Sequence, residues 1–62
     1  MNEEIIEVSD NQSKIHLNGV HRNSGNAVRI VIDCDEKLAI SILTVEEATE
    51  LFIKLASILA KL

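Results

Sequence analysis

The chain has 62 residues, a formal net charge of -4, one cysteine and one aromatic residue. A single domain covering 1–62 is expected; it is too short to bury a large core, and a lone cysteine excludes a disulfide as reinforcement. Direct nucleic-acid binding is disfavoured, because phosphates require basic patches and unpaired bases stack on aromatic rings.

Before residue 44 the sequence alternates between apolar and polar residues, which is typical of strands. We predict strands at residues 4–8, 14–21, 27–33 and 38–43, separated by turn-forming residues at 9–13, 22–26 and 34–37. Gly25 and the asparagines of the second turn, Asn23 and Asn26, are expected to be able to take a positive φ. Short connections make consecutive strands antiparallel neighbours. The side chains expected to face the core are Ile15, Leu17, Val28, Ile30, Ile32, Leu38, Ile40 and Ile42.

Residues 44–62 predict an amphipathic helix. Thr44 and Glu47 have the spacing of a capping box, in which each side chain accepts a hydrogen bond from the other residue's backbone N–H. A broad apolar face follows at helical spacing and is expected to cover the sheet. Its members are Ala48, Leu51, Phe52, Leu55, Ile58, Leu59 and Leu62. The predicted fold is therefore α+β, an antiparallel β-meander of three to four strands packed against one C-terminal helix (ββββα).

A second apolar seam runs along the same helix, beside the broad face. It consists of Thr49, Ile53, Ala56 and Ala60, at spacings of four, three and four residues. One sheet does not easily cover both surfaces, and the small side chains allow another backbone to approach closely. We expect this seam to form a homodimer interface; the alternative is that the N-terminal arm of the same chain covers it.

Two acidic groups are candidate protein-binding residues. Glu3, Glu4 and Glu7 lie near the N-terminus, and Glu46, Glu47 and Glu50 lie in the first turns of the helix. Such clusters can occupy a basic groove on another protein by electrostatic complementarity. The alternative is that these charges only maintain solubility.

An alternative site is formed by Lys14, His16 and Arg29, which are expected on the open face of the sheet. Three donors on one face could bind a phosphate or a carboxylate, and the alternative there is a solvated face with internal ion pairs. The acidic turn around Cys34 matches no metal-binding pattern, and Cys34 has no recognisable base or oxyanion turn. We therefore expect no catalytic residue, no metal and no cofactor.

The sequence is most consistent with a non-catalytic, small homodimeric interaction protein, such as a phage-type inhibitor that blocks a basic site on a host defence or nucleic-acid-processing protein. The alternative function is a small-ligand binder that sequesters an anionic metabolite or nucleotide without turnover. Because the sequence shows neither a signal peptide nor a membrane-spanning stretch, we expect a cytoplasmic protein with no membrane partner.

Overall fold

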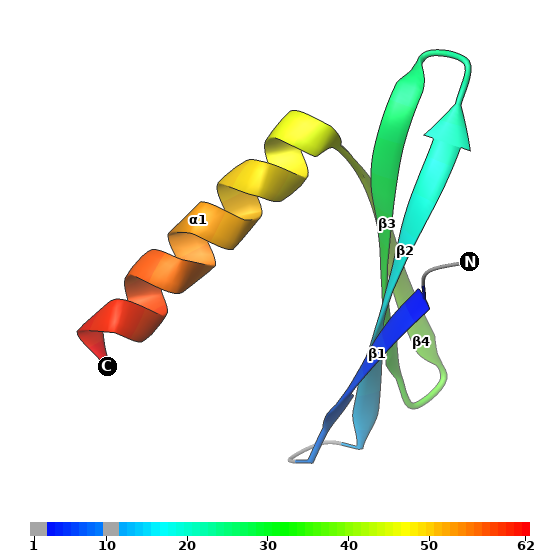
Figure 1. Cartoon of the computed structure of the whole chain (residues 1–62). Helices are drawn as coiled ribbons and strands as arrows, with labels where there is room; N and C mark the ends of the chain where they lie inside the picture. Colours follow the sequence, from blue (N-terminus) through cyan, green and yellow to red (C-terminus); the bar gives the residue numbers. More distant parts are fainter. Residues whose placement is uncertain (1–2, 10–11) are drawn as a thin grey trace.

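The computed structural model of the chain describes residues 3–9 and 12–62. It contains β1 (Glu3–Val8), β2 (Ser13–Arg22), β3 (Gly25–Cys34), β4 (Lys37–Thr44) and α1 (Val45–Lys61). The strands form one antiparallel sheet in the order β1-β2-β3-β4, and α1 packs against β3 and β4 (Figure 1). The predicted ββββα meander is confirmed, and the sheet has four strands because β1 pairs with β2.

Two-residue turns connect the three longer strands. Arg22 lies opposite Gly25, and Cys34 lies opposite Lys37, so only residues 23–24 and 35–36 remain between the paired strands. Gly25 has a φ of 127°, a backbone conformation that residues with a Cβ rarely adopt. Asp35 has a φ of 56°, which Asp tolerates better than most residues. The expected role of Gly25 in this turn is confirmed.

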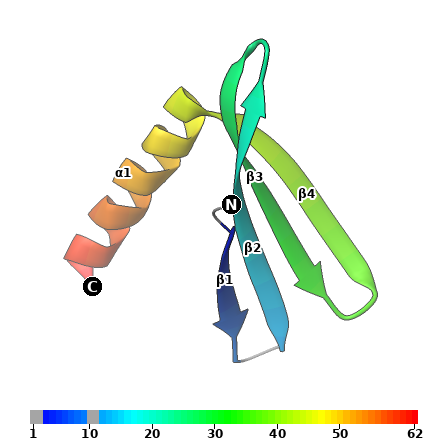
Figure 2. The same cartoon turned by 45° about the vertical axis from the view of Figure 1, so that its right-hand side comes forward.

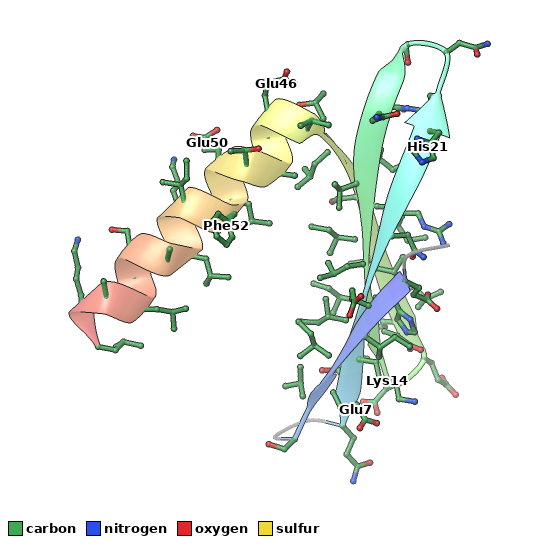
Figure 3. The ribbon with its side chains drawn as sticks, viewed as in Figure 1. Glu7, Lys14, His21, Glu46, Glu50 and Phe52 are labelled. Atoms are coloured by element: carbon green, nitrogen blue, oxygen red, sulfur yellow. The ribbon has the colours of Figure 1, made fainter. Side chains whose placement is uncertain are left out.

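Pairing across the strands defines two sides of the sheet, because directly opposed residues point the same way. The helix-facing side carries the aliphatic residues Ile6, Ile15, Leu17, Val28, Ile30, Ile32 and Leu43. The outer side carries Lys14, His16 and Arg29. Figure 3 agrees: over the middle of the sheet, carbon side chains point toward the helix and nitrogen-bearing ones point away from it.

One part of the predicted core is wrong. Leu38, Ile40 and Ile42 were expected on the helix-facing side, but they lie opposite Asp33, Val31 and Arg29 and therefore belong to the outer side. The physical reason is the two-residue turn at 35–36, which fixes the register of β4. Ala39, Ser41 and Leu43 of β4 take the helix-facing positions instead.

The predicted capping box starts the helix. Thr44 Oγ1 accepts a hydrogen bond from the Glu47 N–H at 3.1 Å, and Glu47 Oε1 accepts one from the Thr44 N–H at 2.9 Å. From this fixed start, α1 diverges from the sheet, so that its C-terminal end lies far from every strand (Figures 1 and 2). The cap thus determines where the helix begins, and contact with the sheet is confined to the helix start.

The two layers do not cover each other completely. Among the described residues, the only buried ones are Ser13 and Ala27, and none of the large apolar side chains is fully buried. The radius of gyration is 13.0 Å, compared with about 11 Å for a compact chain of this length. The broad apolar face of the helix, which was expected to cover the sheet, therefore does so only near the helix start, because the helix diverges before the rest of that face reaches the sheet.

Candidate protein-interaction site

The broad apolar face of α1 is the largest uncovered surface of the helix. Only Ala48, near the sheet, is half-buried, whereas Phe52 is 70% exposed and Leu59 is 61% exposed. Figure 3 shows Glu46 and Glu50 on the other side of the helix from Phe52. The helix thus has a polar side turned outward and an apolar side that its own chain leaves open.

The second seam, Thr49, Ile53, Ala56 and Ala60, continues this apolar surface round the helix. Ile53 is 59% exposed, and both alanines are exposed as well. Thr49 is the one polar member, and its Oγ1 already donates a hydrogen bond to the Val45 carbonyl oxygen at 2.8 Å. That hydroxyl already has its acceptor within the helix. Thr49 can therefore be buried against a partner without leaving an unsatisfied hydrogen-bond donor.

The total exposed area measures how much surface lacks a cover. The chain exposes 5423 Å², whereas a folded monomer of 6.9 kDa exposes about 4,000 Å². The excess is about 1,400 Å² per chain, and a stable protein interface buries about 800 Å² on each partner. The uncovered surface is therefore large enough for an obligate interface.

The structure divides the N-terminal acidic group between the two sides of the sheet. Glu3 and Glu7 point to the outer side, and Glu4, one residue along, points to the helix-facing side opposite Leu17. Glu3 Oε2 lies 3.4 Å from His16 Nδ1, so a protonated His16 would partly neutralise it. These three carboxylates therefore do not form one continuous acidic surface.

The acidic group on α1 is also partly engaged. Glu47 belongs to the capping box, and Glu50 Oε2 forms an exposed ion pair with Lys54 Nζ at 3.0 Å. Glu46 lies with Glu50 on the outward side of the helix (Figure 3). Because a solvated i,i+4 ion pair contributes little energy, Glu50 can give up its ion pair with Lys54 and form one with a basic partner protein instead.

Lys14, His16 and Arg29 do lie on one side of the sheet, as the sequence predicts, but carboxylates lie among them. Lys14 stands between Glu7 and Asp33 in a charged row across three strands (Glu7, Lys14, Asp33). His16 is beside Glu3, as described above. Mixed charges lower the positive potential that would attract an anion.

Asn18 shares this outer side and lies opposite Arg29. Its Oδ1 is buried and has no hydrogen-bond partner in the structure. That oxygen requires a donor, which a carboxylate or a phosphodiester anion does not supply. The side chain therefore gives the alternative anion site no further support.

The outer side also carries surface residues that the sequence reasoning placed in the core. Leu38 is 64% exposed, Ile40 is 60% exposed and Ile42 is 49% exposed. Pairing the strands across a two-residue turn at 35–36 would have shown that Leu38 shares a side with Asp33. The signal was present in the turn length, which the alternation of apolar residues alone does not reveal.

Cys34 is half-buried and reduced at the end of β3. It lies on the helix-facing side, whereas His16 lies on the outer side, and His21 is at the other end of the hairpin, where its Nδ1 is 2.9 Å from Asn26 Oδ1. Neither histidine is placed to activate the thiol. Within residues 3–9 and 12–62, no three metal-ligating side chains form a cluster.

In the described part of the chain, no helix has the length and apolar character needed to cross a bilayer. Comparisons of the sequence with protein-family models and with curated proteins, and of the structure with solved structures, find no match.

Proposed function

We propose that this chain is a non-catalytic interaction protein that acts as a homodimer. The observation that carries the proposal is the excess of about 1,400 Å² of exposed surface over that of a monomer of the same mass. Much of the uncovered apolar surface belongs to α1 and the open sheet, where large aliphatic side chains stand in water. A chain with these surfaces gains stability when a partner covers them.

A second copy of the chain is the occupant that fits best. The excess of about 1,400 Å² belongs to the whole chain, so an interface on α1 would bury part of it, and about 800 Å² on each copy is enough for a stable interface. An isologous interface needs a self-complementary surface. The α1 seam meets this requirement because the larger Ile53 of one copy can pack against the small alanines of the other. The broad face and the seam together then form the dimer interface, which is wider than the seam alone.

The acidic residues outside this interface are the proposed recognition surface. Glu46 and Glu50 lie on the outward side of α1, where a dimer that forms through the opposite side leaves them accessible. A basic site on another protein complements them, as expected for an inhibitor that blocks such a site. Blocking a basic site in this way is the function that we expect from the sequence, that of a phage-type inhibitor.

A pair of adjacent substitutions tests the dimer. Ala56→Glu places a carboxylate in the seam, and Ser57→Glu places the same side chain on the polar side of α1. Both positions are exposed in the single chain, so neither change should unfold it. In sedimentation equilibrium, Ala56→Glu should dissociate the dimer because the new charge would be buried unpaired, and Ser57→Glu should not. A wild-type monomer at high micromolar concentration would refute the proposal.

The recognition surface has a separate test. Glu46→Gln with Glu50→Gln removes two charges without reversing their interaction with the helix dipole. A protein captured from the native host should be lost both with this variant and in 0.5 M salt, since screening weakens charge attraction. Equal capture by the wild type and the variant would show that these carboxylates do not bind the partner.

A further inference from the structure

The helix-facing side of β1 and β2 is an apolar surface that α1 of the same chain does not reach. Ile6, Ile15, Ile32 and Ala39 form one row across the four strands. Ile6 is 50% exposed and Ile32 is 43% exposed. All residues of α1, β1 and β2 are described, and no Cα of the helix lies within 8 Å of a Cα of these two strands. The sheet therefore presents open aliphatic side chains on the side from which the helix departs.

The junction between β4 and α1 sets the direction of the helix. Thr44 is the last residue of β4 and also the N-cap of α1, so no linker separates the two elements. The two hydrogen bonds of the capping box hold Thr44 and Glu47 together at this point. From there the helix runs away from the sheet (Figures 1 and 2). The chain thus has no flexible segment that lets α1 turn back onto β1 and β2.

We propose that α1 of each copy covers the helix-facing side of the other copy's sheet, an inference that rests on the homodimer proposed above. The broad apolar face of the helix then packs on aliphatic strand residues of the partner, and the second seam packs on the second helix. With 17 residues, α1 is about 25 Å long, whereas four adjacent strands span about 14 Å. One helix is therefore long enough to cross the whole sheet of its partner.

A second copy fits this surface because each chain carries both halves of the contact, an open apolar helix face and an open aliphatic sheet side. Each copy gives one helix and receives one, so the exchange is isologous and two copies close the assembly. A dimer joined by the helices alone would leave the aliphatic side of the sheet in water. The exchange covers both surfaces that contribute to the excess of about 1,400 Å², of which a stable interface needs about 800 Å² on each copy.

The charges around this contact are complementary. Within β1 and β2, Glu4 is the only carboxylate on the helix-facing side, where it lies opposite Leu17. The second half of α1, residues 54–62, carries Lys54 and Lys61 and no acidic side chain. A lysine beside an apolar helix face can lay its stem over apolar surface and place its ammonium group next to a carboxylate. The second half of the partner's helix therefore matches β1 and β2 in charge as well as in apolar character.

Sedimentation equilibrium of two matched variants tests the exchange. Ile6 points to the helix-facing side and Ile5 to the outer side, and their exposed fractions in the single chain are nearly equal, 50% and 52%. Ile6→Lys would place an ammonium group under the partner's helix and should raise the dimer Kd by about two powers of ten or more, whereas Ile5→Lys should leave the Kd unchanged. Circular dichroism checks that both variants keep the wild-type fold.

The outcomes separate the exchange from the homodimer itself. A wild-type dimer whose Kd is the same in Ile6→Lys would overturn the exchange and leave a dimer joined by the helices. Equal weakening by Ile5→Lys and Ile6→Lys would also overturn the exchange, because the contact would not depend on the side of the sheet. A wild-type chain that stays monomeric at high micromolar concentration would overturn the homodimer and the exchange together.

Nuclear Overhauser effects provide a measurement that needs no substitution. In a mixture of isotope-labelled and unlabelled wild-type chains, isotope-filtered spectra should show contacts between the Ile6 methyl groups of one copy and the leucine methyl groups of α1 in the other. If intermolecular contacts join only helix to helix, or if Ile6 contacts α1 of its own chain alone, the exchange is wrong.

Discussion

Replacement of Phe52 by alanine should weaken self-association far more than it affects the single chain. Phe52 is 70% exposed, so about 140 Å² of an aromatic side chain is available to a partner. Alanine keeps the Cβ, and the change removes about 100 Å² from each half of the interface. At about 25 cal/mol per Å², the loss is about 2.5 kcal/mol per copy and about 5 kcal/mol per dimer. The dimer Kd should therefore rise by about three to four powers of ten.

Sedimentation equilibrium over a wide concentration range measures this Kd, and circular dichroism reports the fold of the dissociated chain. Ser57→Ala is the matched control, because Ser57 lies on the polar side of α1 and should leave the Kd unchanged. A Kd shift of less than tenfold for Phe52→Ala would place Phe52 outside the interface. Equal destabilisation at every concentration would mean that Phe52 packs within its own chain, and the interface reasoning would fail.

Three further substitutions test the local structure by chemical denaturation. Thr44→Ala removes a capping-box acceptor and should cost about 0.5–2 kcal/mol, with lower helix content in circular dichroism. Gly25→Ala should destabilise by about 1 kcal/mol or more because the φ of 127° excludes a Cβ, whereas Gly19→Ala, which has open space and no such φ, should be neutral or stabilising. Similar effects at both glycines would contradict the turn assignment. Lys14→Glu places three like charges in the charged row and should lower the free energy of unfolding by up to about 1 kcal/mol more than Lys14→Gln does. An equal loss in the two variants would show that the row contributes no electrostatic energy.

Local patterns in the sequence were sufficient for the order and type of the elements. Alternation identified the strands, and the spacing of Thr44 and Glu47 identified the start of the helix, because both signals depend on residues close together in the chain. The turn at Gly25 followed in the same way, since only glycine readily adopts its φ. The placement of Lys14 and His16 on one side of β2 also followed from alternation, whereas Arg29 shares that side because of the register between β2 and β3.

Only the tertiary structure decided how the two layers meet. Alternation gives each strand two sides but does not say which sides of neighbouring strands coincide, so the side of Leu38, Ile40 and Ile42 depended on the two-residue turn before β4. The helix pattern likewise requires a cover for its apolar face but does not say which surface provides it. The capping box sets where α1 begins, and its path away from the sheet leaves that face open. Beyond the helix start the sheet therefore leaves this surface exposed, and in the proposed homodimer a second copy would cover it.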